Sequence, residues 1–214
     1  MGVRLILLAL ALRGDAEQAI RAWTKEPLAY VDAKDVRDVP GLAVARCDYQ
    51  EGWWGFFGCY GMKDGAVAWQ AAVDEEPTEQ SIFSVRGRKS AVVGAPLIEV
   101  IGRTHMGNGS LYVYELRDRA LRTVLRTRAY DGNCHEGLEF KGRCLDVQAR
   151  EPRPGALEIE LSGAIQRVED VGAPAGETWP CRKIFSWDAK RRIFVEDVGR
   201  RLGFGPDEET WPRK

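Results

Sequence analysis

The chain has 214 residues, a length that suits one domain of ordinary size or two small ones. Of these residues 44% are hydrophobic and 29% are charged, a composition that is typical of globular proteins and excludes a disordered chain. The 31 basic residues nearly balance the 32 acidic residues, so the net charge gives no reason to expect a nucleic acid or an anionic membrane as the main partner.

The first sixteen residues have the parts of a secretory signal peptide. Arg4 precedes an apolar run over residues 5–12, and Gly14 and Ala16 have the small-x-small spacing that a signal peptidase needs. This pattern predicts residues 1–16 to be a signal peptide and the mature protein to be secreted or periplasmic. The alternative is a retained helix, because apolar residues recur at helical spacing over residues 9–23. No later apolar stretch is long enough to span a bilayer.

The rest of the chain is predicted to be a short helix followed by strands. Residues 17–40 are expected to hold the helix and a linker, with Pro27 as the stop. Residues 41–200 show short strand patterns between polar turns, which predict a β domain. The strongest hairpin signal is the turn Lys63-Asp64-Gly65 between two apolar runs. Residues 201–214 are expected to be a C-terminal tail.

These elements predict a mainly β fold, in which antiparallel hairpins form a propeller-like or sandwich domain with a short N-terminal helix. The segments 107–114 and 184–188, the second followed by Phe194, resemble strand pairs of exported bacterial proteins with integrin-like or VCBS-like β-propeller repeats. The resemblance covers residues from about 97 to 196. It implies an Asp-rich calcium loop between strands, but residues 150–155 do not have that motif, so no metal or other cofactor is expected.

Five cysteines become candidate disulfides if the protein is exported. Cys47 and Cys59 lie on neighbouring predicted strands, and Cys134 and Cys144 flank a loop rich in glycine and charge. We expect these two local disulfides, which leave Cys181 over. The sequence leaves open that Cys181 pairs with Cys134 or Cys144 instead.

The loop around His135 is the only candidate for catalysis. Asp131, His135 and Glu136 suggest a general acid/base site, which would make the protein a secreted hydrolase. We prefer the simpler explanation, a solvated loop held by Cys134, because polar residues favour turns for backbone reasons alone. A zinc site at Cys134, His135 and Cys144 is disfavoured because the paired cysteine knuckles typical of zinc are absent. Since no nucleophile elbow or phosphate loop occurs either, we expect a non-catalytic protein.

The densest aromatic cluster lies over residues 53–60. Trp53, Trp54 and Phe57 are candidate ligand-binding residues, because an exposed aromatic set forms a stacking platform for a saccharide or a protein contact patch. The alternative is that both faces of this strand are buried. The sequence therefore predicts an exported, β-rich binding or envelope-associated protein with an unknown protein or saccharide ligand, and a secreted hydrolase as the alternative.

Overall fold

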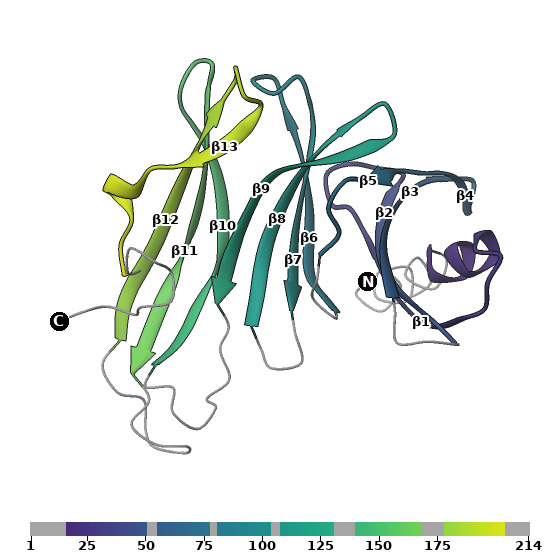
Figure 1. The fold of residues 1–214 in the computed structure, drawn as a ribbon. Coiled ribbons are helices and arrows are strands. Elements are labelled where there is room, and N and C mark those ends of the chain that lie inside the picture. The colour runs from purple at the N-terminus through teal and green to yellow at the C-terminus, as the bar shows by residue number, and fades with distance from the viewer. Residues whose placement is uncertain are drawn as a thin grey trace, which may run out of the picture. The chain divides into compact units, whose positions relative to one another are not determined.

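The computed structural model describes residues 16–50, 55–77, 81–103, 108–130, 140–167 and 178–203 (Figure 1). The fold is mainly β, with almost entirely antiparallel sheets and one short helix over residues 16–23, which confirms the predicted fold class. No helix in the described ranges is long and apolar enough to cross a membrane.

The chain divides into two compact units. The first unit holds residues up to Ser90 together with 94–102 and 112–123, and the second holds 91–93, 103–111 and the chain from Val124 onward. The single β domain that was expected over residues 41–200 is therefore divided between two units.

The first sheet has the strand order β1-β2-β3-β4. Its strands are β1 (Leu28–Asp35), β2 (Leu42–Tyr49), β3 (Gly55–Lys63) and β4 (Ala66–Gln70). Asp64 and Gly65 both have positive φ, as a two-residue hairpin turn requires, so the hairpin between β3 and β4 is confirmed.

Strand β1 was not expected, because its residues were predicted to be linker. It pairs antiparallel with β2, but a register shift between Leu28 and Tyr30 interrupts the alternation of its side chains. Leu28 and Val31 are the only side chains of β1 that are buried. The weak periodicity of this edge strand explains why the sequence did not reveal it.

The second sheet has the order β5-β9-β8-β7-β6. Its strands are β5 (Ala72–Val73), β6 (Ser81–Ser90), β7 (Ala95–Arg103), β8 (Asn108–Arg117) and β9 (Ala120–Tyr130). The short β5 pairs parallel with the start of β9.

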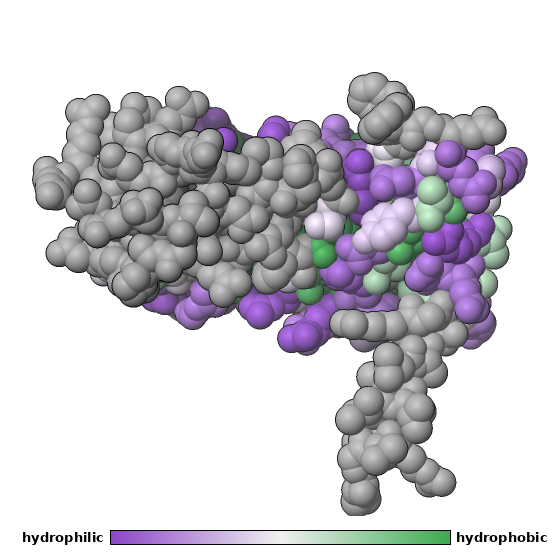
Figure 2. All heavy atoms as spheres, turned by 90° about the horizontal axis from the view of Figure 1, so that it is seen from below, coloured by the Kyte–Doolittle hydropathy of each residue, from purple (hydrophilic) through white to green (hydrophobic). Residues whose placement is uncertain are grey.

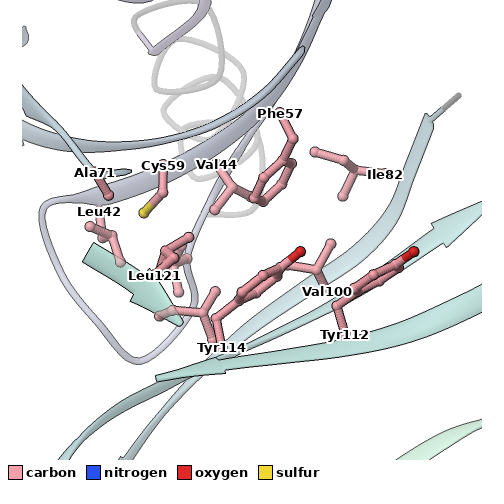
Figure 3. Close-up of a cluster of buried hydrophobic side chains, with 12 residues drawn as sticks. Leu42, Val44, Phe57, Cys59, Ala71, Ile82, Val100, Tyr112, Tyr114 and Leu121 are labelled. Atoms are coloured by element: carbon pink, nitrogen blue, oxygen red, sulfur yellow. The ribbon is translucent and has the colours of Figure 1, made fainter. Parts of the chain in front are cut away.

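The core of the first unit has two parts, one on each face of the first sheet. On one face, side chains of both sheets meet in the sandwich core, where Phe57 lies opposite Tyr114 (Figure 3). This core contains Val36, Leu42, Val44, Phe57, Cys59, Ala71, Ile82, Ile98, Val100, Tyr112, Tyr114 and Leu121. On the other face, Ala19 and Ile20 of the helix cover the helix-side core. This second core contains Ala19, Ile20, Leu28, Val31, Ala45, Cys47, Tyr60 and Val67.

The third sheet belongs to the second unit and has the order β10-β11-β12-β13. Its strands are β10 (Phe140–Arg153), β11 (Ala156–Arg167), β12 (Thr178–Asp188) and β13 (Ile193–Glu196), and a 3-10 turn η1 (Val198–Arg200) follows. Leu157, Ile159 and Leu161 are buried as the alternating pattern predicts. Their polar neighbour Glu160 is only 9% exposed and makes an ion pair with Arg150 at 3.0 Å.

An ion pair holds η1 against this sheet. Arg200 donates hydrogen bonds to Glu158 of β11 and to Asp197, and the Ser186 hydroxyl of β12 lies 3.3 Å from Glu158. The Arg200 hydrogen bond is the largest cause of a lowered pKa of Glu158. A carboxylate with a lowered pKa stabilises the folded state above its ordinary pKa, and this contribution is lost as the pH falls through the folded value.

We therefore expect Arg200→Gln to raise the pKa of Glu158 towards its ordinary value of 4.5. An NMR titration of the glutamate side-chain carboxyls measures this pKa directly. Arg191→Gln, which removes an exposed cation from the turn before β13, should leave Glu158 unchanged. Identical Glu158 titrations in the wild type and the Arg200 variant would contradict the role of this ion pair.

Candidate functional site

The candidate platform of Trp53, Trp54 and Phe57 is only partly within the described residues. Trp53 and Trp54 lie outside them. Phe57 is 2% exposed, and its ring stacks on Tyr114 with centroids 5.8 Å apart. The prediction that Phe57 binds a ligand is therefore wrong, because strand alternation points this ring into the sandwich core.

The neighbouring residue, Phe56, is on the opposite face and borders a surface groove. The groove has a volume of about 470 Å³. We call it the aromatic groove, and its lining residues are Trp23, Thr24, Lys25, Tyr49, Phe56 and Gln70. Four elements place them: the end of the helix, the end of β2, the start of β3 and the end of β4.

The aromatic rings of the groove differ in their packing: Tyr49 and Phe56 pack against the core, whereas Trp23 is exposed. Tyr49 and Phe56 pack with centroids 5.3 Å apart and planes tilted by 36°, and both lean on the helix-side core. Trp23 is 45% exposed. Burial raises the pKa of Tyr49, and the nearby carboxylates of Glu26 and Glu76 add to this effect. The Tyr49 hydroxyl therefore stays protonated and keeps its ability to donate a hydrogen bond.

The helix end that carries Trp23 is held by two hydrogen bonds. The Arg21 guanidinium donates to the Leu28 carbonyl at 2.7 Å, and the Thr24 hydroxyl donates to the Ile20 carbonyl at 3.0 Å. Ile20 itself is fully buried against the first sheet. These contacts fix one wall of the groove relative to the strands that form the other.

A buried polar pair lies on the same face of the sheet as Phe56. Cys47 is the cross-strand partner of Phe56, and its thiol is next to the Tyr60 hydroxyl. Tyr60 is fully buried, and apart from the Cys47 thiol its hydroxyl has no hydrogen-bond partner in the described part of the chain. Its ring lies over Gly58, where an added Cβ would come within 2.4 Å of the hydroxyl oxygen. This face is therefore tightly packed below the groove.

The predicted disulfide between Cys47 and Cys59 is wrong, because both cysteines are free and buried. In the β2–β3 register, Cys59 pairs with Val44, three residues from Cys47. An odd separation places the two side chains on opposite faces of a sheet. Cys47 accordingly lies in the helix-side core and Cys59 in the sandwich core.

The remaining cysteines concern the second unit. Cys181 is disulfide-bonded. Cys134 and the side chain of Cys144 lie outside the described residues. Because Cys47 and Cys59 are free, only Cys134 and Cys144 remain as partners for Cys181, and a disulfide to either one excludes a disulfide between the two. The predicted pairing of Cys134 with Cys144 is therefore wrong, and the alternative in which Cys181 pairs with one of them fits.

The proposed acid/base residues Asp131, His135 and Glu136 lie outside the described residues, so the hydrolase alternative also stays a prediction. Within the described ranges, no group of three or more His, Cys, Asp or Glu side chains is arranged to hold a metal ion. The aromatic groove is a candidate site for a ligand because three aromatic side chains line it.

Comparison with known proteins found no matching family model, no similar curated protein and no similar solved structure. The resemblance of residues from about 97 to 196 to integrin-like or VCBS-like repeats therefore stays a prediction.

The adjacent residues Phe56 and Phe57 should differ clearly in what they contribute to stability. Phe57→Ala should lower the free energy of unfolding by about 3–5 kcal/mol, because it empties part of a packed core. Phe56→Ala should cost only about 1–2 kcal/mol, because its ring is half-buried. Urea unfolding of both variants measures the difference, and equal losses would contradict the assignment of the two rings to different environments.

The thiols of Cys47 and Cys59 should be unreactive in the folded protein. Burial is the main cause that raises the pKa of Cys47 to about 11 and of Cys59 to about 12. Both thiols therefore favour the folded state below their ordinary pKa of 9.0, and this contribution is lost as the pH rises through about 11.

At pH 8 we expect an aromatic disulfide reagent to label neither thiol in the native protein and both after unfolding in urea. Peptide mapping after alkylation identifies which cysteines react. Fast native labelling, or recovery of a peptide that joins Cys47 to Cys59, would contradict this prediction.

Proposed function

We propose that the chain is an exported, non-catalytic binding protein whose aromatic groove binds a saccharide. The observation that carries this proposal is the composition of the groove. Three aromatic side chains, Trp23, Tyr49 and Phe56, lie beside the polar side chains of Lys25 and Gln70. A pyranose ring has apolar C–H faces that stack on aromatic rings and hydroxyl groups at its edge that bond to polar side chains.

The size of the groove favours a small ligand over a protein partner. Its volume of about 470 Å³ falls within the range of about 300–1,000 Å³ that is usual for small-molecule sites. A stable protein interface buries about 800 Å² on each partner. Figure 2 shows one face of the molecule, on which small hydrophobic patches are separated by hydrophilic side chains in the described part.

Export is supported by the apolar run over residues 5–12 and the small residues that follow it. Cleavage after Ala16 would retain Ala19 and Ile20, which anchor the helix to the first sheet. The mature chain would also retain Trp23 and the other residues that line the groove. The proposed maturation and the proposed site are therefore compatible.

The test is a panel of soluble gluco-, xylo-, manno- and chito-oligosaccharides titrated by calorimetry. For a sugar that binds, Trp23→Ala should weaken the affinity about tenfold, since an aromatic contact is worth about 0.5–1.5 kcal/mol beyond the area that it buries. Phe56→Ala should weaken it by a similar factor.

Tyr30→Ala is the matched control. Tyr30 is 45% exposed, like Trp23, but it does not line the groove, so its removal should leave the affinity unchanged. The proposal is overturned if the wild type binds no sugar of the panel, or if Trp23→Ala and Tyr30→Ala have equal effects. Circular dichroism of each variant checks that the fold is retained.

A further inference from the structure

A second cavity of the first unit has a different chemical character from the aromatic groove. It has a volume of about 410 Å³, which suits a small molecule. We call it the charged pocket, and its lining includes Ala33, Lys34, Asp35, Arg37, Ser84 and Val85. It lies where β1 ends and the middle of β6 comes close.

The central feature of the pocket is that two oppositely charged side chains, Asp35 and Arg37, line it without forming an ion pair with each other. Asp35 and Arg37 are both exposed, and among the described residues neither side chain makes an ion pair or a hydrogen bond. Asp35 is the last residue of β1 and Arg37 lies in the turn that follows it, and both residues line the pocket. The intervening residue, Val36, is 3% exposed and points into the sandwich core.

The third charge of the pocket has a partner within the protein. The Lys34 ammonium lies 2.9 Å from the Asp32 carboxylate, which also accepts a hydrogen bond from the Ile82 amide at 3.2 Å. The charge of Lys34 is therefore used in an ion pair within the protein. Asp35 and Arg37 are the charges of the pocket that remain available to a ligand.

The backbone that carries Arg37 is held firmly by β6. The Gly87 amide donates to the Arg37 carbonyl at 2.6 Å. A Cβ at position 87 would come within 2.7 Å of that carbonyl and 2.4 Å of Val39, so the approach requires glycine. The Val36 amide in turn donates to the Leu42 carbonyl at 2.8 Å. Arg37 is thus presented from a fixed main chain.

We propose that the charged pocket binds a small zwitterion with one carboxylate and one ammonium group, of the α-amino acid class. Arg37 is the partner for the carboxylate, which a guanidinium binds with two parallel hydrogen bonds. Asp35 is the partner for the ammonium, and the Ser84 hydroxyl supplies a neutral hydrogen-bonding group. Ala33 and Val85 form an apolar wall, which fits an amino acid with a short aliphatic side chain.

A ligand with a single charge would satisfy this pocket less well. A simple anion at Arg37 is repelled by Asp35, and a simple cation at Asp35 is repelled by Arg37. A zwitterion meets both charges with opposite ones. Selection between these ligands therefore depends on the two side chains separately, which makes the proposal testable one charge at a time.

The experiment compares alanine, valine and leucine with their amides, which lack the carboxylate, and with their N-acetyl derivatives, which lack the ammonium. Binding to the full chain is measured by ligand-observed NMR and calorimetry. The wild type should prefer the free amino acid over both derivatives by at least about tenfold. Arg37→Gln should abolish the preference over the amide, and Asp35→Asn should abolish the preference over the N-acetyl derivative.

Arg122→Gln and Asp64→Asn are matched controls, because they remove one exposed charge each from other places in the same unit. They should leave both preferences unchanged. The proposal is overturned if no amino acid binds at millimolar concentration, if the N-acetyl derivative or acetate binds as well as the amino acid, or if either pocket variant keeps the full preference.

This proposal stands independently of saccharide binding. Trp23→Ala should leave amino-acid binding unchanged, because Trp23 lines the aromatic groove and not the charged pocket. A loss of sugar binding alone therefore tests the groove, and a loss of amino-acid selectivity alone tests the pocket.

Discussion

The burial of the first sheet on both faces is the constraint on which the rest of the first unit depends. Leu42 and Val44 of β2 enter the sandwich core, whereas Ala45 and Cys47 of the same strand enter the helix-side core. A shift of this strand by one residue would exchange the two sets and place Arg46 where an apolar side chain is needed. The register of β2 and β3 is therefore strongly specified, and with it the positions of Tyr49 and Phe56 at the strand ends.

The helix connects this constraint to both candidate sites. Ala19 and Ile20 anchor it to the sheet, and Trp23 at one end lines the aromatic groove. At the other end Ala16, which the proposed cleavage would remove, borders the charged pocket. A helix packed on a sheet covers the middle of the face and leaves concave edges where its ends meet the strands. The two cavities border opposite ends of this helix, and their linings differ because the strands beside them differ in sequence.

Much of the architecture could be predicted from the sequence. The Asp64-Gly65 turn and the alternation of Leu157, Ile159 and Leu161 have local signals that depend only on a few neighbouring residues. Strand β1 was missed because a register shift interrupts its pattern. The predicted Cys47–Cys59 disulfide failed because adjacency of two strands does not determine which face each cysteine occupies.

The candidate site was harder to predict than the fold, because the face of the sheet that each residue occupies is not determined by the local sequence. The aromatic cluster could be found in the sequence, but the choice between Phe56 and Phe57 depends on which face of β3 the helix covers. The positions of Trp23 and Gln70 in the groove are even harder to predict from the sequence, because these residues lie on other elements and come together only on folding. The charged pocket has no local signal at all, since Ser84 and Val85 come from β6, almost fifty residues after Asp35 and Arg37.

The free thiols of the first unit bear on the proposal of export. An oxidising compartment converts accessible thiols to disulfides, and attack requires the thiolate form. Burial keeps Cys47 and Cys59 protonated, and the opposite faces of the sheet keep them apart. Either thiol can react only when the sheet opens, so the same two-sided packing that defines the groove also protects the cysteines. Reduced cysteines in this unit are therefore compatible with an exported protein whose second unit carries the disulfide at Cys181.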